Sequence, residues 1–234
     1  MMKIVCAISL LLSLPLLASE QLLLVTAADM EQRIGTLQRY DRCGERYCKT
    51  GTVITVNLGR NGLGWGLGLP FEHPVADPIK HEGDGRAPAG LFALRGVFGY
   101  APSADTRMPY RQASADLICV DDTASRAYNR LVPVAEAGAV KSFEWMRRDD
   151  ALYRLGVTVA HNEAQLPGRG SCIFLHLQKA PGSPTSGCTS MSAEALRSVT
   201  AWLDPAAKPL LVQIPLDACG AVAARFPGVE CPLR

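Results

Sequence analysis

The pattern of apolar and polar residues along the chain predicts short β-strands. Residues 52–58 alternate, with Ile54 and Val56 on one face and Thr55 and Asn57 on the other, which is the period of a half-buried strand. Other apolar runs of strand length are bounded by turn residues and lie at 91–94, 117–120, 152–159, 172–177 and 210–214. We expect these runs to form the body of the fold.

Helices are fewer. Residues 193–203 place Leu196, Val199 and Leu203 at helical spacing, with Ser192 as N-cap and Pro205 beyond the end. A shorter helix is expected over residues 142–149. No repeat, linker or low-complexity tract interrupts the region after residue 28, so the pattern predicts one mainly β domain with a few helices.

Composition narrows the functional classes. The chain has 234 residues, 48% of them hydrophobic, and a net charge of +2 from 24 basic and 22 acidic residues. This composition predicts a folded protein, and the absence of a basic run argues against nucleic acid as a partner. The glycine-rich stretches at 59–68 and 83–90 lack the spacing of nucleotide-binding loops.

The N-terminal segment predicts export. Lys3 precedes an apolar stretch that ends near Leu17, and small residues at 25–28 suit a signal peptidase, so we expect residues 1–28 to be a signal peptide. The alternative is a membrane anchor, which Glu20 and Gln21 interrupt. We therefore expect an exported protein of the periplasm or cell envelope, with no stable membrane span after cleavage.

The cysteine count is odd in the predicted mature chain. Removing residues 1–28 takes away Cys6 and leaves seven cysteines, at 43, 48, 119, 172, 188, 219 and 231. In an exported protein one cysteine left over suggests a free reactive thiol. Zinc is a poor alternative because no C-x-x-C pair is present.

The candidate chemistry lies between residues 171 and 191. His176 stands in an apolar strand, and Cys188 follows Gly187 shortly before the predicted helix. A helix N-terminus and a nearby imidazole both favour a thiolate, and Gly187 would let backbone N–H groups form an oxyanion hole. The alternatives are a core histidine and a cysteine in a disulfide.

Several runs together resemble one family. They are K-H-E-G-D-G-R-A-P-A-G at 80–90, F-G-Y at 98–100, C-V-D-D at 119–122, H-N at 161–162, G-S-C-I-F-L-H at 170–176 and S-G-C-T at 186–189. Their identity and order resemble YkuD-type L,D-transpeptidase catalytic domains over residues 50–215. This chain departs from the commonest family motif at Ser186, where a histidine is usual, and at Ser190, where arginine or asparagine is usual.

The resemblance implies a β-sandwich-like fold of mixed sheets and an active site with no metal or organic cofactor. Cys188 would attack an L,D peptide bond in a peptidoglycan stem peptide, His176 would transfer the proton, and Gly187 would support the oxyanion. An amine acceptor then gives a cross-link, whereas water makes the enzyme an L,D-carboxypeptidase. Carbapenem-type inhibitors are the expected covalent ligands.

The resemblance also suggests residues for substrate binding, each of which has a structural alternative such as a turn or a loop cap. These residues are Lys80, Arg86, His161, Asn162, Ser186 and Thr189.

With Cys188 assigned as nucleophile, six cysteines remain. Cys43 with Cys48 and Cys219 with Cys231 are paired by proximity, and Cys119 with Cys172 by elimination. The expected organisation is a signal peptide at 1–28, an N-terminal extension at 29–49 with a local disulfide, a catalytic domain at 50–216 and a disulfide-tied tail at 217–234.

Two other classes remain as alternatives. A papain-like peptidase also uses cysteine and histidine, but its cysteine precedes its histidine in the chain. A non-catalytic cell-wall-binding module would need neither Cys188 nor His176.

Overall fold

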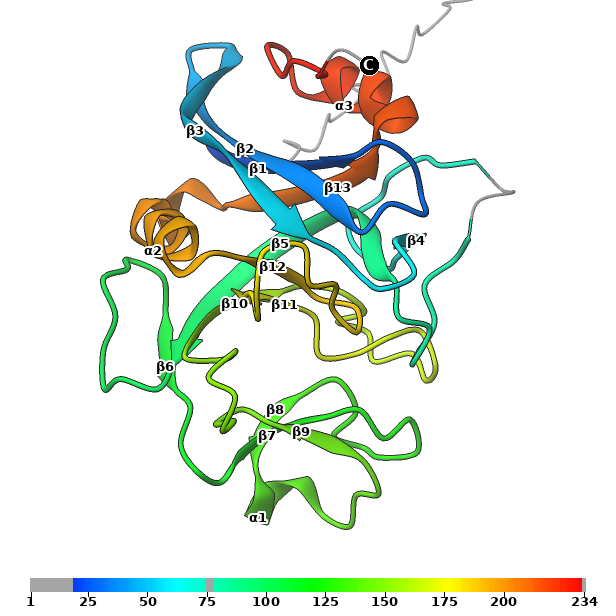
Figure 1. Ribbon diagram of the computed structural model, residues 1–234, viewed down its shortest axis with the longest axis vertical. Helices are drawn as coiled ribbons and strands as arrows, with labels where there is room; N and C mark the ends of the chain where they lie inside the picture. The colour runs from blue at the N-terminus through cyan, green and yellow to red at the C-terminus, as the bar shows by residue number, and fades with distance from the viewer. Residues whose placement is uncertain (1–18, 75–77, 233–234) are drawn as a thin grey trace, which may run out of the picture.

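The computed structural model describes residues 19–74 and 78–232, and most of its strands belong to one large mixed sheet (Figure 1). The strands follow the order β10, β11, β12, β3, β2, β1, β13, β5 and β4, with β6 beside β5. Their bounds are β1 Gln21–Ala27, β2 Ile34–Cys43, β3 Arg46–Asn57, β4 Leu63–Trp65, β5 Ala87–Gly99, β6 Tyr110–Gln112, β10 Leu155–Val159, β11 Phe174–Leu177, β12 Thr189–Met191 and β13 Leu210–Pro215.

The long strand β5 makes the large sheet close on itself. Residues 90–93 of β5 pair with β13, and residues 94–99 pair with β10. Because β10 is also the first strand in the order, the path of pairings returns to its start. The expectation of a mainly β fold with mixed sheets and few helices is confirmed.

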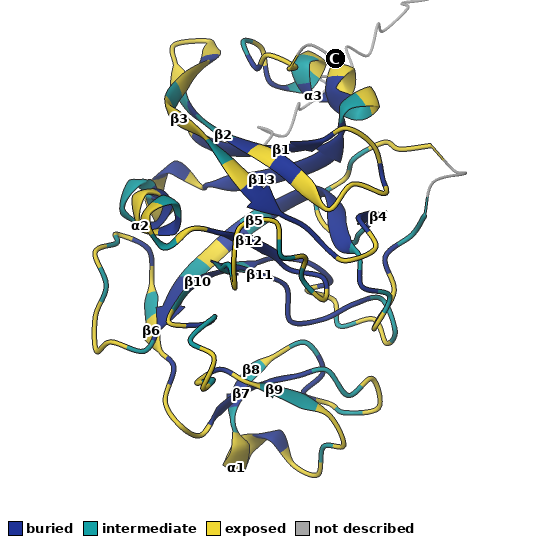
Figure 2. Cartoon of the chain, viewed as in Figure 1, coloured by how far each residue is buried: buried dark blue, intermediate teal, exposed yellow. Residues whose placement is uncertain are grey.

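Strand β1 lies at the centre of this sheet. It pairs in parallel with β13 and antiparallel with β2, and all seven of its residues are buried. Figure 2 shows the buried residues running along β1 and β13. The domain boundary expected at residue 28 is therefore wrong, because cleavage there would remove a central strand. Residues 1–18, the rest of the expected signal peptide, lie outside the described residues.

The expected N-terminal extension at 29–49 is also part of the sheet. β2 and β3 form a long hairpin that pairs from Ile34 opposite Asn57 to Cys43 opposite Arg46. The regular alternation at 52–58 predicts only the C-terminal part of this hairpin, the end of β3. The boundary expected at residue 49 falls inside β3 and separates no structural unit.

The helices are short and lie outside the large sheet: α1 (Val134–Ala137), α2 (Ala193–Trp202) and α3 (Cys219–Arg225). Helix α2 confirms the expectation for 193–203, since Ser192 Oγ accepts a hydrogen bond from the Ala195 N–H. Within the described ranges no helix has the length and apolar character needed to cross a membrane.

The helix expected over 142–149 is wrong, because this segment belongs to a second, three-stranded sheet. The small sheet contains β7 (Leu117–Val120), β8 (Leu131–Pro133) and β9 (Phe143–Trp145) in the order β8, β7, β9. β9 pairs with β7 through backbone hydrogen bonds, a tertiary contact that overrides a weak local helical pattern. Figure 1 shows the small sheet apart from the large one, on the side of β10 and β11.

Three disulfides tie these parts together, and all three match the expected pairing: Cys43–Cys48, Cys119–Cys172 and Cys219–Cys231. The first closes the β2–β3 hairpin and the third holds α3 to the C-terminal segment. The second joins β7 of the small sheet to the segment that leads into β11. Among the described residues, Cys188 is the free cysteine.

Candidate active site

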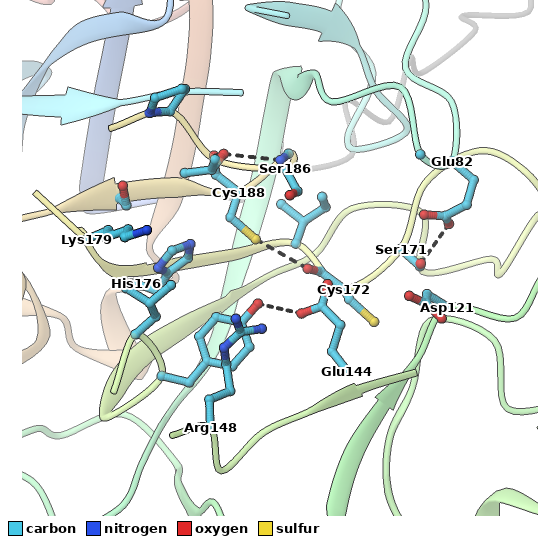
Figure 3. Close-up of a pocket in the computed structure, with 18 of the residues that line it drawn as sticks. Glu82, Asp121, Glu144, Arg148, Ser171, Cys172, His176, Lys179, Ser186 and Cys188 are labelled. Carbon is cyan, nitrogen blue, oxygen red and sulfur yellow. Dashed lines mark hydrogen bonds between the residues drawn. The ribbon is translucent and has the colours of Figure 1, made fainter. Parts of the chain in front are cut away.

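A cavity of about 310 Å³ lies where the small sheet faces β11 and β12. It is lined by His176 on β11 and Cys188 just before β12, and from the other side by Glu144 on β9 and Asp121 just after β7. Figure 3 shows the thiol and the imidazole reaching into the same cavity. The structure therefore brings together the two residues that sequence reasoning selected as nucleophile and base.

Cys188 stands on the turn that leads into β12 and is 7% exposed. Its Sγ donates a hydrogen bond to the Cys172 carbonyl oxygen at 3.4 Å and accepts one from the Phe174 N–H at 3.3 Å. The acceptor shows that the sulfur carries its proton in this arrangement, because a carbonyl oxygen has no proton to donate.

His176 lies on β11, where the parallel register places it opposite Ser190 of β12. Its Nδ1 is 2.8 Å from the Leu177 carbonyl oxygen. Because that oxygen only accepts, Nδ1 carries the proton and the lone pair of the neutral ring is on Nε2. An imidazole with this tautomer can accept a proton at Nε2.

Burial favours the neutral form of both groups. Loss of solvation raises the pKa of the Cys188 thiol to about 12, with a further contribution from the negative charge of Glu144. Loss of solvation lowers the pKa of His176 to about 4. At neutral pH the resting pair is therefore a thiol and a neutral imidazole, not the thiolate and imidazolium that the sequence led us to expect.

The N-terminus of α2 does not offset the effect of burial on the Cys188 thiol. β12 separates Cys188 from Ser192, the N-cap of α2. Three residues of extended strand span about 10 Å, so the N-terminal peptide dipoles of α2 are too far from the sulfur to favour a thiolate strongly. The expected contribution of the helix to Cys188 is wrong for this reason.

Thr185 organises the turn around the nucleophile, and sequence reasoning gave it no role. Its Oγ1 accepts a hydrogen bond from the Gly187 N–H at 3.1 Å and donates one to the Cys188 carbonyl oxygen at 2.6 Å. Gly187 has φ +154°, and a Cβ there would lie 3.1 Å from the Arg86 carbonyl oxygen. Glycine is thus required for the turn, but its N–H serves Thr185 in the resting site and is not a preformed oxyanion donor.

Two of the expected substrate-binding residues line the cavity. Ser186 is exposed at its edge. Lys80 also lines the cavity, but it is buried and its Nζ lies 2.6 Å from both Asp84 Oδ1 and the His81 carbonyl oxygen. Lys80 therefore supplies a fixed positive charge, held by the turn that Asp84 forms.

The other expected substrate contacts are structural. Arg86 Nη1 donates to the carbonyl oxygens of Leu63 and Met30, and Thr189 Oγ1 donates to Gln213 Oε1. Neither residue lines the cavity. Both side chains instead hold neighbouring chain segments together by these hydrogen bonds.

His161 and Asn162 build a loop beside the cavity. His161 accepts from the Leu67 N–H at Nδ1 and its Nε2 lies 2.9 Å from the Arg169 carbonyl oxygen, while burial lowers its pKa to about 4. The Asn162 amide bonds backbone groups of Leu166 and Gly170. Neither side chain lines the cavity, and both hold the loop together in this structure.

The cavity carries opposite charges at its two ends. Figure 3 shows Lys179 beside His176, with Arg148 below, and Glu82 and Asp121 at the opposite end. Asp121 Oδ1 is buried and has no hydrogen-bond partner in the described part of the chain. Within that part, no cluster of three or more His, Cys, Asp or Glu side chains is arranged to hold a metal.

Tyr153, Glu144 and Arg148 also line the site, and the sequence pattern did not single them out. Tyr153 OH donates to Glu144 Oε2 at 2.5 Å, and the Arg148 guanidinium lies 5.1 Å from the tyrosine ring centroid. The run of charged and aromatic residues at 143–153 is the signal that the sequence offers, and its local pattern predicts a helix followed by a strand.

Comparison with family models, with curated proteins and with solved structures gives no match for this chain.

Proposed function

We propose that this protein is an exported cysteine acyltransferase that forms cross-links between peptidoglycan stem peptides, in the manner of L,D-transpeptidases. The observation that carries the proposal is the single free thiol among the described cysteines, placed in a cavity with an imidazole whose Nε2 can accept a proton. The motif resemblance over residues 50–215 supplies the reaction class.

The reaction assigns one role to each of the two side chains. His176 Nε2 takes the proton of Cys188 as the sulfur attacks the carbonyl carbon of an L,D peptide bond, giving a tetrahedral oxyanion. When the C–N bond breaks, the imidazolium returns the proton to the leaving amine and a thioester remains. An amine from a second stem attacks the thioester, its proton passes through His176 to the sulfur, and a new amide forms.

The charges of the cavity support a peptide that carries both a carboxylate and an ammonium group. Arg148 and Lys179 suit a carboxylate, and Asp121 with Glu82 suits an ammonium group. Stem peptides that contain diaminopimelate have both groups close to the bond that would be broken. Arg148 already pairs with Asp150, and Glu82 accepts hydrogen bonds from Tyr128 and Ser171. Asp121, whose buried Oδ1 has no partner among the described residues, is therefore the charge that most favours an ammonium-bearing substrate.

The disulfides support the proposed location. Six cysteines of the described chain are paired, which is typical of proteins that mature in an oxidising compartment. The periplasm or cell envelope is such a compartment and is where peptidoglycan is assembled.

Purified muropeptides test the proposal. The native protein should convert disaccharide tetrapeptides into cross-linked dimers with release of D-alanine, while Cys188→Ala and His176→Ala should form none. Release of D-alanine without dimers would identify a carboxypeptidase that uses the same site. No change in the muropeptides, together with tight retention on intact sacculi, would identify a wall-binding module and contradict the proposal.

A further inference from the structure

Tyr153 has a fixed ring and one mobile proton beside the nucleophile. The side chain is 4% exposed and its ring meets Phe98, Phe174 and His176 edge to face, at centroid distances of 5.8, 5.5 and 5.3 Å. A ring packed on several sides does not change its rotamer readily. The hydroxyl proton can still turn about the C–O bond, so its acceptor can change while the ring stays in place.

Two acceptors compete for this proton. The hydroxyl donates to Glu144 Oε2 at 2.5 Å. Tyr153 and Cys188 also belong to the same buried cluster and line the same cavity, and hydrogen bonding by Tyr153 lowers the pKa of the Cys188 thiol. A phenol has one O–H to donate. While Glu144 holds that proton, a thiolate formed at Cys188 lacks this donor.

Glu144 also opposes the thiolate by its own charge. The other charged and titratable side chains that line the cavity with Cys188 are Lys80 and Glu82 before β5, Asp121 after β7, Glu144 on β9, Arg148 after β9, Tyr153 before β10, His176 on β11 and Lys179 after β11. Glu144 disfavours a negative sulfur, whereas Lys80 and the Tyr153 hydroxyl favour it. Both effects of Glu144, the charge and the captured proton, keep Cys188 as a thiol.

Glu144 lines the cavity and is therefore open to a substrate group. We infer that the Glu144–Tyr153 pair is a switch on the nucleophile: a cationic group of the substrate takes Glu144, and the Tyr153 hydroxyl then donates to the Cys188 thiolate. The cationic group is an ammonium of the donor peptide. The inference rests on the proposed function in taking Cys188 as the nucleophile, and Tyr153 acts as a positioning residue.

Alkylation of Cys188 tests the switch without any peptidoglycan substrate. The rate of reaction of the folded, disulfide-intact protein with iodoacetamide is followed by intact mass from pH 6 to 10. Glu144→Gln should react roughly tenfold faster at pH 7, since one pKa unit changes the thiolate fraction tenfold, and its profile should shift to lower pH. Tyr153→Phe alone should react at close to the native rate with this neutral reagent, because Glu144 already holds the hydroxyl proton in the native protein. The double variant should lose most of the gain of Glu144→Gln, because the freed hydroxyl supplies that gain.

Matched variants control for the general effects of the substitutions. Glu163→Gln removes a carboxylate that pairs with Arg95 away from the cavity, and Tyr110→Phe removes a hydroxyl bonded to the Ala101 carbonyl oxygen. Both should react as the native protein does. Near-ultraviolet circular dichroism of each variant establishes that the aromatic core is intact.

A positively charged reagent tests whether a cationic group binds Glu144 and thereby activates Cys188. With 2-bromoethylamine, which carries an ammonium group, the native protein should gain in rate relative to iodoacetamide, and Glu144→Gln should lose that gain.

The inference is overturned if the double variant keeps the full gain of Glu144→Gln, or if Glu144→Gln keeps the native protein's gain with 2-bromoethylamine. If alkylation follows the expected order but muropeptides are not processed, the switch stands and the proposed function fails.

Discussion

The central position of β1 leads to a direct prediction about the mature N-terminus. A chain that begins at Ser19 keeps β1, whereas a chain that begins at Asp29 lacks it. We expect the longer chain to fold and the shorter one to remain largely unfolded. Export followed by cleavage near Ser19 would give a mature protein that retains the strand.

The size of the effect follows from burial. Leu22, Leu23 and Val25 are 0% exposed and Leu24 is 2% exposed. Burying each of these side chains stabilises the fold by about 2 kcal/mol, or about 8 kcal/mol together. A typical domain has a free energy of unfolding of about 5–15 kcal/mol, so this loss alone removes most or all of it. The edges of β2 and β13 would also lose their backbone partners.

The assay is urea denaturation of both chains, followed by far- and near-ultraviolet circular dichroism. A Leu23→Ala variant of the longer chain serves as the matched control, because it should lose about 3 kcal/mol and still fold cooperatively. A chain starting at Asp29 that unfolds cooperatively, with a free energy within 1 kcal/mol of the longer chain, would refute the placement of β1.

Three further predictions concern stability and binding. Replacing both Cys119 and Cys172 by serine should lower the free energy of unfolding by about 4 kcal/mol in urea titrations, since the bridge closes a loop with a sequence separation of 53; an unchanged midpoint would contradict this. His161 and His176 have pKa values lowered to about 4, so between pH 6.5 and 4 the unfolded chain binds protons that the folded chain does not. The free energy of unfolding therefore decreases as the pH is lowered, by about 2.5 kcal/mol for each histidine at pH 4.5. The raised pKa of a buried glutamate in the cavity acts in the opposite direction, so the measurement is the difference between the native protein and His161→Gln, which should lose about half of the histidine contribution; equal pH dependence would contradict the assignment. Asp121→Asn should raise KM for an ammonium-bearing stem peptide about tenfold with little change in kcat, because it removes a charged partner; an unchanged KM in steady-state assays would rule out an ammonium contact there.

Strands and helices were predictable where the local pattern of apolar and polar residues is enough to determine the element. The run 117–120 is a strand with the expected bounds, and the 193–203 helix has its Ser192 cap. β1 was missed because a continuous apolar strand buried on both faces has the same composition as the end of a signal peptide. Local composition cannot distinguish them; only the pairing with β2 and β13 does.

The identity of the free thiol and the pairing of the other cysteines were predictable from the sequence. The odd number of cysteines indicated one free thiol, the motif resemblance selected Cys188 as that thiol, and the three expected disulfides are present. The surroundings of Cys188 were not predictable, because Tyr153 and Glu144 meet it only through the packing of the small sheet against β11. Polar residues in the conspicuous motifs, such as His161 and Arg86, are used to hold loops instead.

The most direct test of the account is covalent trapping of Cys188. The native protein is incubated with a carbapenem or with a donor stem tetrapeptide, then analysed by intact mass and by mapping of the modified peptide. The account predicts one acyl group per chain, on Cys188, that is absent in Cys188→Ala and formed much more slowly in His176→Ala. A correctly folded native protein that acquires no acyl group, or acquires it on another residue, would contradict the assignment of Cys188 as the nucleophile.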